Sequence, residues 1–139
     1  MDRFIIRPYK IEDEDKVINL WRKCGLVVPH NDPKEDIDTK IAFQPELFFI
    51  GLIDDKIITS VMSGYEGHRG WINYLAVLPE FQRKGFASLM MEKAEEVLRE
   101  MGCLKINLQV REGNETVIAF YESIGYTDDH VISFGKRLK

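Results

Sequence analysis

The sequence has few cysteines and no paired histidines, and these absences exclude disulfide-rich and metal-binding proteins. Cys24 and Cys103 are the two cysteines among 139 residues, and neither belongs to a CxxC or Cys/His pattern. His30, His68 and His130 are scattered and lack the spacing of metal ligands. We therefore expect reduced thiols, no bound metal and a cytoplasmic protein.

Long apolar runs and an excess of basic residues are also missing. No apolar segment approaches the roughly 20 residues that a membrane span requires. The first ten residues, "MDRFIIRPYK", lack the apolar core of a signal peptide. The formal net charge is −4, without the basic balance of a nucleic-acid-binding domain. We expect neither a membrane nor a nucleic acid as partner, and the length favours a single domain over residues 1–139.

Hydrophobic periodicity and turn residues predict the order β-α-α-β-β-β-α-β-α-β. A strand at 70–78, a helix at 85–101 and a strand at 105–111 form one crossover, which requires parallel pairing there. We therefore predict an α/β (α+β) fold with a mixed, mostly antiparallel sheet and about four helices. The other expected strands cover 3–8, 47–53, 56–67 and 130–138, and the other helices 10–24, 33–43 and 114–125.

The loop before the long helix has the features of an anion site. In "VLPEFQRKGFASLMM" (77–91), Gln82, Arg83 and Lys84 precede Gly85 at the start of an amphipathic helix. The first backbone N–H groups of a helix lack intrahelical partners and carry partial positive charge, which suits a pyrophosphate. Gly85 allows close approach of the backbone, and Ala87 is small. The segment is neither a P-loop nor a GxGxxG fingerprint.

Two segments resemble one known family. "YLAVLPEFQRKGFASLMMEKAEEVL" (74–98) resembles the acetyl-CoA-binding segment of the GNAT N-acetyltransferases, whose loop reads Q/R-x-x-G-x-G/A. "NETVIAFYESIGY" (114–126) resembles the second cofactor segment of that family. "PHNDPKEDI" and "GYEGHRG" further resemble its small bacterial YpeA-like branch. The resemblance implies a GNAT-like fold, acetyl-CoA as cosubstrate without metal, an amine acceptor, and a monomer or homodimer.

The resemblance also implies which residues bind the cosubstrate. The backbone of Leu75 and Val77 pairs with the pantetheine arm, the N–H groups from Arg83 to Ser88 hold the pyrophosphate, and Asn114 contacts the cofactor. The full implied set is Leu75, Ala76, Val77, Gln82, Arg83, Lys84, Gly85, Phe86, Ala87, Ser88, Asn114, Phe120 and Tyr121.

Tyr121 is the implied catalytic acid, facing the thioester sulfur. A phenol has a pKa of about 10 and a thiol about 8.5, so a tyrosine can protonate or stabilise a departing thiolate. From periodicity alone, Tyr121 is a core-facing residue. The general base stays open, because Gln109 occupies the place of a glutamate in relatives that acetylate protein N-termini. The candidates are Glu66, which also fits a solvent-facing turn carboxylate, and a water chain near Asn73 and Tyr74.

Two functional hypotheses follow. In the first, the protein moves an acetyl group from acetyl-CoA to a primary amine by direct attack. The acceptor is then a protein or peptide α-amine, or an amine on a small molecule. In the second, the protein is a CoA-binding regulatory or interaction module with little turnover. The missing glutamate supports the second hypothesis, whereas Tyr121 supports the first.

Overall fold

A computed structural model describes residues 3–138, and the chain forms two compact units that divide between Leu108 and Gln109. The first unit contains the sheet and the three helices that position its loops. The second unit contains one helix, α4 (Glu115–Ser123). The elements of the first unit are β1 (Phe4–Pro8), α1 (Glu14–Lys23), α2 (Pro33–Ile41), β2 (Phe48–Ile53), β3 (Lys56–Tyr65), β4 (Gly70–Val77), α3 (Phe86–Glu100) and β5 (Ile106–Leu108).

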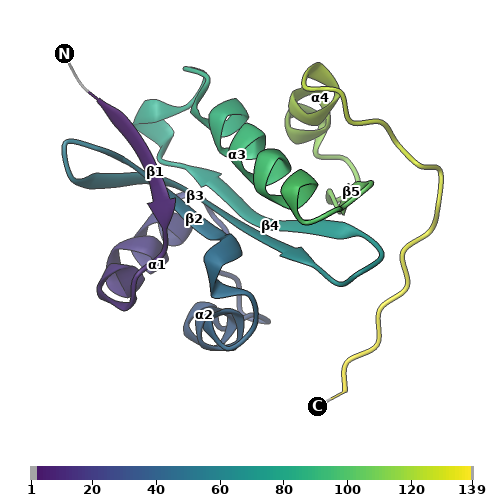
Figure 1. Cartoon of the computed structure of the whole chain (residues 1–139), viewed down its shortest axis with the longest axis horizontal. Coiled ribbons are helices and arrows are strands. Elements are labelled where there is room, and N and C mark those ends of the chain that lie inside the picture. Colours follow the sequence, from purple (N-terminus) through teal and green to yellow (C-terminus); the bar gives the residue numbers. More distant parts are fainter. Residues whose placement is uncertain (1–2, 139) are drawn as a thin grey trace. The chain divides into compact units, whose positions relative to one another are not determined.

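The sheet is mixed, as the sequence predicted. Its strands lie in the order β1-β2-β3-β4-β5, and each neighbouring pair is antiparallel except β4 and β5, which are parallel. The parallel pair is joined through α3 (Figure 1). The expected crossover is therefore confirmed.

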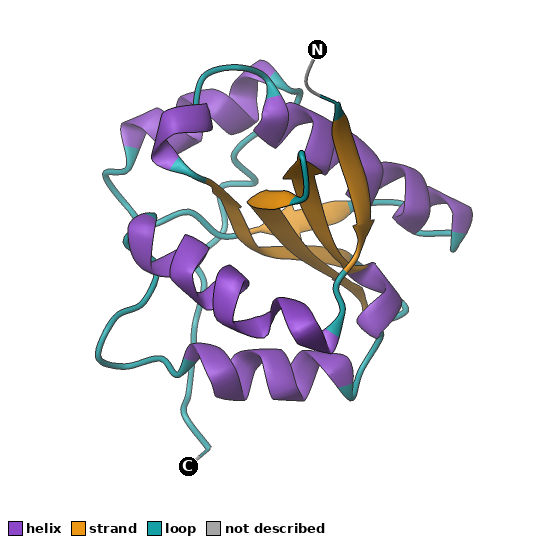
Figure 2. Cartoon of the chain, turned by 90° about the vertical axis from the view of Figure 1, so that its left-hand side faces the viewer, coloured by secondary structure: helices purple, strands orange, loops and turns teal. Residues whose placement is uncertain are grey.

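Helices cover both faces of the sheet. Consecutive strand residues point to opposite faces, so Phe48 and Phe49 mark the two sides. Trp21 of α1 stacks on Phe48 at 6.2 Å, whereas the Nζ of Lys93 on α3 lies 5.8 Å from the centre of the Phe49 ring. Hence α1 and α3 pack on opposite faces, and Figures 1 and 2 show helices on the two sides of the strands. The face under α1 carries an apolar cluster, which includes Ile37 of α2.

The two helices expected before the meander form with only small changes in their limits. The second one, α2, begins as predicted: Asp32 is its N-cap and accepts hydrogen bonds from the N–H groups of Lys34 (3.0 Å) and Glu35 (3.2 Å). Pro33 is its first residue. Among residues 3–138, no helix is both long and apolar enough to cross a membrane.

The predicted strand at 130–138 is wrong, and the strand predicted at 105–111 is shorter. Residues 127–138 have neither helix nor strand, and β5 ends at Leu108. An alternating sequence forms a strand only where a partner completes its hydrogen bonds and one face is buried. Here Val131, Ile132 and Phe134 are all strongly exposed, so no face of this segment is buried.

Candidate functional site

The strand β4 separates from β5 halfway along its length. The parallel pairing joins Gly70, Trp71 and Ile72 to residues 106–108 and goes no further. From Asn73 to Val77, β4 therefore continues with pairing to β3 but none to β5. This leaves an open edge of backbone beside the middle of the sheet.

A β-bulge lies where this open edge begins. Asn73 pairs with Met62 and Ala76 pairs with Ser60, so two residues of β4 oppose one residue of β3. One of the two is Tyr74, whose φ of 52° is unusual for a residue with a Cβ. Bulges redirect side chains and leave one residue unpaired in the ladder. The bulge therefore turns Tyr74 out of the regular strand.

Side chains from α1 and β3 hold the bulge. The Tyr74 ring stacks on the Trp21 ring at 3.8 Å between centroids, with 12° between the planes. The Trp21 Nε1–H donates to Ser60 Oγ at 2.9 Å, and the Ser60 hydroxyl donates to the Tyr74 carbonyl at 2.9 Å. Trp21 and Ser60 are completely buried. Both the ring and the backbone of Tyr74 are therefore fixed from the interior.

The Tyr74 hydroxyl belongs to a second chain of hydrogen bonds. It donates to Asp36 Oδ2 on α2 at 2.5 Å and accepts from Asn31 Nδ2 at 2.7 Å. Burial, and next the hydrogen bond to Asp36, raise the pKa of Tyr74 to about 12. Asn31, Tyr74 and Asp36 are all half-buried, and the sequence did not predict that they lie together.

Backbone groups at the end of β4 face the open edge. The Leu78 N–H donates to the Ile58 carbonyl at 2.8 Å, and bonding alternates along an antiparallel pair, so the Val77 N–H points away from β3. The Val77 carbonyl accepts from Cys24 Sγ at 3.2 Å and from Gln82 Nε2 at 2.9 Å. The Gln82 side chain therefore ties the loop to β4, and its predicted role as a donor to an anion stays a prediction.

The helix α3 starts without a capping side chain. Gly85 is its N-cap with a φ of 90°, and a Cβ placed there would meet nothing within 4 Å. By contrast, the side chains of Asp32 and Asn114 cap α2 and α4. The first turn of α3 has no acidic residue. Arg83, with a φ of 62°, is exposed immediately before it. An exposed, uncapped helix start with an adjacent cation is well suited to an anion.

The remaining residues predicted around this loop fall into two groups. Leu75, Phe86, Ala87 and Ser88 are half-buried, and Ala76 is buried. Lys84 is exposed, with its Nζ 5.9 Å from the centre of the Phe81 ring.

The second unit carries the other predicted residues. Asn114 caps α4 by accepting from the Val117 N–H at 3.4 Å. Tyr121 lies between the Phe120 and Tyr126 rings, at 5.1 and 5.6 Å from their centroids. Burial raises the pKa of Tyr121 to about 12. Gln109 donates to the Ser133 hydroxyl.

Glu66 lies in the turn between β3 and β4. One carboxylate oxygen accepts from the Arg69 N–H of the same turn at 3.2 Å and lies 3.9 Å from His68 Nδ1. Its side chain is 53% exposed. These contacts fit a solvent-facing turn carboxylate, which was one of the two alternatives for Glu66. The role of Glu66 as base stays a prediction.

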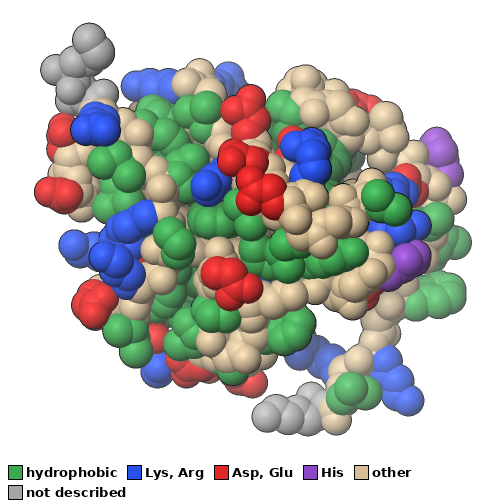
Figure 3. Space-filling model, viewed as in Figure 1, with side chains coloured by type: hydrophobic (Ala, Val, Ile, Leu, Met, Phe, Trp, Pro, Cys, Tyr) green, Lys and Arg blue, Asp and Glu red, His purple; other side chains and the backbone are tan. Residues whose placement is uncertain are grey.

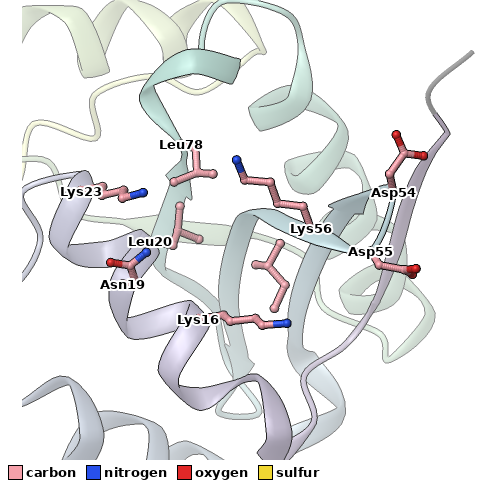
Figure 4. Close-up of a pocket in the computed structure, with 9 residues that line it drawn as sticks. Lys16, Asn19, Leu20, Lys23, Asp54, Asp55, Lys56 and Leu78 are labelled. Atoms are coloured by element: carbon pink, nitrogen blue, oxygen red, sulfur yellow. The ribbon is translucent and has the colours of Figure 1, made fainter.

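A cavity lies beside α1, and Leu78, which follows β4, is among its lining residues. It has a volume of about 370 Å³ between α1 and the turn that joins β2 to β3. Lys16, Lys23 and Lys56 line it with an apolar floor that includes Leu20 and Leu78 (Figure 4). On the face drawn in Figure 3, acidic and basic side chains are interspersed. Within residues 3–138, no group of three or more His, Cys, Asp or Glu is arranged to hold a metal ion.

Comparisons with known proteins agree with this architecture. The sequence model of the Acetyltransferase (GNAT) family matches residues 11–126. An acetyltransferase of Yersinia enterocolitica is 44% identical over 133 residues, covering 96% of this chain and 94% of the relative. An acetyltransferase of Pectobacterium atrosepticum is 43% identical with the same coverage. The chain belongs to the GNAT acetyltransferase family, and it is an acetyltransferase.

Solved structures share the fold at low identity. The PaiA N-acetyltransferase of Thermoplasma acidophilum, in complex with coenzyme A, has a TM-score of 0.81 at 20% identity and covers 90% of each chain. An aminoglycoside N-acetyltransferase in complex with CoA has a TM-score of 0.79 at 15% identity, covering 100% of this chain and 97% of its own. The ribosomal-protein-S18-alanine N-acetyltransferase of Escherichia coli has a TM-score of 0.74 at 20% identity, covering 88% and 77%.

The geometry around Ser60 leads to a stability prediction. Ser60→Ala leaves the buried Trp21 N–H without an acceptor, which costs about 1–3 kcal/mol of unfolding free energy. A matched control is Ser63→Ala on the same strand, since the buried Ser63 hydroxyl only donates to the Leu47 carbonyl. We expect the control to cost less, because Ser63→Ala removes the partner of one carbonyl, whereas Ser60→Ala removes the partner of both the Trp21 N–H and the Tyr74 carbonyl. Denaturant unfolding measures both, and equal losses would contradict the role given to Ser60.

Proposed function

We propose that the protein is an acetyl-CoA-dependent N-acetyltransferase that acetylates a primary amine. The acceptor is a protein or peptide α-amine, or the amine of a small molecule. The observation that carries the proposal is the uncapped, exposed start of α3, which follows the stretch of β4 that has no pairing to β5. Among solved structures of this fold, one enzyme is named for a ribosomal-protein alanine and another for aminoglycosides, so the fold does not choose between these classes.

In this proposal the pyrophosphate of acetyl-CoA binds at the start of α3. The N–H groups from Arg83 to Ser88 donate to its oxygens, and the side chains of Arg83 and Lys84 add positive charge. Gly85 fits this role because the space around its Cα is empty, so that backbone and phosphate can approach closely. Gln82 fixes the loop through its bond to Val77, and the second N–H of its amide is the donor that it adds to the anion site.

The pantetheine arm then extends along the open edge of β4. The Val77 N–H points toward this edge, and Leu75 and Ala76 continue the same stretch. An extended chain gains two or more hydrogen bonds when it adds to a free sheet edge. From Val77 back to Tyr74 the strand is about 10 Å long, so the reacting end of the arm comes to the bulge.

Acetyl-CoA supplies an activated acyl group, and the chain's residues orient the amine and handle its protons. Tyr121 keeps its proton at neutral pH because its pKa is raised, and we assign it as hydrogen-bond donor to the departing sulfur. Phe120 packs against it. Asn114, which caps the start of α4, is assigned as a contact of the cofactor.

The acceptor is an amine of lowered basicity. Attack requires the neutral amine, and at pH 7 an α-amine with a pKa of about 8 costs about 1.4 kcal/mol to deprotonate. A lysine with a pKa of about 10.4 costs about 4.6 kcal/mol. A site without a carboxylate in direct contact with the amine meets the smaller cost more readily.

Replacing Gly85 with valine tests the cosubstrate site. Gly85→Val places a side chain where the pyrophosphate approaches, so calorimetric titration should find acetyl-CoA binding lost. Gly102→Val is the matched control, because Gly102 has a similar φ of 89° with open space and lies at the other end of α3. The control shares the backbone strain but should keep its affinity. Parent-like affinity in Gly85→Val would rule out this loop as the pyrophosphate site.

Replacing Tyr121 with phenylalanine tests the acid. Tyr121→Phe keeps the ring packing but removes the donor, so turnover should fall by about 10²–10⁴-fold with acetyl-CoA affinity unchanged. Tyr126→Phe, the neighbouring ring, should keep the parent rate. If Tyr121→Phe stays within about threefold of the parent, Tyr121 has only a structural role.

A screen of acceptors tests the reaction itself. Free-thiol release from acetyl-CoA is followed with a panel of small amines and two matched peptides, across about pH 6–9. One peptide has a free N-terminus and no lysine, and the other is N-blocked with one lysine. We expect release with the first peptide or with small amines of low basicity. Acetylation of the lysine peptide alone would contradict the acceptor class, and binding without any release would favour the non-catalytic module.

A further inference from the structure

We propose that Tyr74 and Asp36 form the proton relay that converts the acceptor ammonium into the attacking amine. In this relay Tyr74 is a catalytic residue that touches the amine, and Asp36 takes the proton through it. The inference rests on the proposed function, and it names the base that the sequence left open. It is carried by the hydrogen-bonded chain Asn31–Tyr74–Asp36 beside the bulge of β4.

The direction of the relay is fixed by the Asn31 amide. The Val28 N–H can only donate, and it donates to Asn31 Oδ1 at 2.8 Å. The Nδ2 of Asn31 in turn donates to the Leu26 carbonyl at 3.3 Å and to the Tyr74 hydroxyl oxygen at 2.7 Å. The Tyr74 proton must therefore point to Asp36, which accepts it at 2.5 Å.

This arrangement leaves one acceptor position on the Tyr74 hydroxyl oxygen. A hydroxyl has one proton and two lone pairs. The proton is bound to Asp36 and one lone pair to Asn31, so the second lone pair is available to an incoming N–H. The Tyr74 pKa of about 12 keeps its hydroxyl protonated at neutral pH. The hydroxyl therefore suits a relay, in which it accepts one proton while it donates another.

The proton transfer balances in one step. One ammonium proton moves to the Tyr74 oxygen while the Tyr74 proton moves to Asp36 Oδ2. The neutral nitrogen then attacks the thioester carbonyl, the C–N bond forms and the C–S bond breaks. A second proton leaves the nitrogen as the amide forms, and the departing sulfur ends as a thiol. Asp36 is half-buried and returns its proton to solvent.

The surroundings of Tyr74 favour a cationic acceptor. Asp32 and Asp36 contribute negative charge from α2 and its cap, and both raise the Tyr74 pKa. The neighbours from the other packed elements are neutral: Trp21 from α1 and Ser60 from β3. The stacking on Trp21 and the strained φ of Tyr74 hold the hydroxyl in one place, as backbone strain commonly does at functional sites.

The test is the pH profile of acetylation by single and double variants. Tyr74→Phe keeps the stacked ring, and Asp36→Asn keeps a hydrogen-bond acceptor, but neither can relay a proton. With the acceptor found in the panel, each should lose about 10²-fold in turnover below the acceptor's pKa. Each should recover to within about threefold once the pH exceeds that pKa, because solvent then supplies the neutral amine. The double variant should be as slow as each single variant and no slower, because either substitution alone already interrupts the relay.

Controls separate this relay from a structural effect and from the proposed function. Tyr65→Phe removes a hydroxyl that donates only within a turn, to the Gly67 carbonyl, and should keep the parent profile. Acetyl-CoA affinity and thermal midpoint are measured for every variant. If Tyr74→Phe and Asp36→Asn both keep the parent pH profile, the relay is wrong but the proposed function stands. The relay is also wrong if Glu66→Gln, and not these two variants, loses the low-pH activity. Failure of the parent to bind acetyl-CoA overturns the proposed function and the relay with it.

Discussion

The stacking of Trp21 on Tyr74 is the interaction on which the rest of the candidate site depends. In a regular strand the Tyr74 side chain would only alternate with its neighbours between the two faces of the sheet, and β4 would have no reason to part from β5. The bulge instead turns Tyr74 toward α1 and α2, and the buried chain Trp21–Ser60–Tyr74 fixes it there. The left-handed φ of Tyr74 costs about 1–3 kcal/mol, which the stacking and these two buried hydrogen bonds offset.

One strand therefore connects two different kinds of chemistry. Toward its end, β4 presents the Val77 N–H and leads into the bare start of α3, where backbone donors face outward. At its middle, the same strand presents the Tyr74 hydroxyl between an amide and a carboxylate. The anion-binding end suits a charged cosubstrate, and the proton-handling middle suits an amine. Along the strand, Val77 and Tyr74 are separated by about 10 Å of extended chain.

Sequence patterns predicted the elements but only part of the site. The meander, the crossover through α3 and the caps at Asp32 and Asn114 were predictable because each has a local signal in periodicity or in a capping side chain. The strand at 130–138 failed because alternation carries no information on whether a partner strand is present. At the loop, Gly85 predicted a helix start without a capping side chain, and α3 begins in this way. No feature of the sequence predicted that Gln82 hydrogen-bonds to the Val77 carbonyl.

The network around Tyr74 had no such signal. Asn31, Asp36 and Tyr74 come together only when α2 packs against the sheet, and a tyrosine in a strand gives no sign of a left-handed φ. The sequence directed attention to Glu66, whose carboxylate bonds within its own turn and whose role as base stays a prediction. The alternative of a water chain near Asn73 and Tyr74 named the strand that carries this network, but not Asn31 or Asp36.

Amide hydrogen exchange with and without acetyl-CoA tests the central claim most directly, because it reports on backbone N–H groups one segment at a time. The account predicts slower exchange in residues 75–77 and 83–88 when acetyl-CoA is bound, since these N–H groups acquire acceptors. Saturating binding that leaves both segments unchanged would contradict it. Slowing confined to the segments around Lys16, Lys23 and Lys56 would do so most clearly, because it would place the ligand in the cavity beside α1 instead.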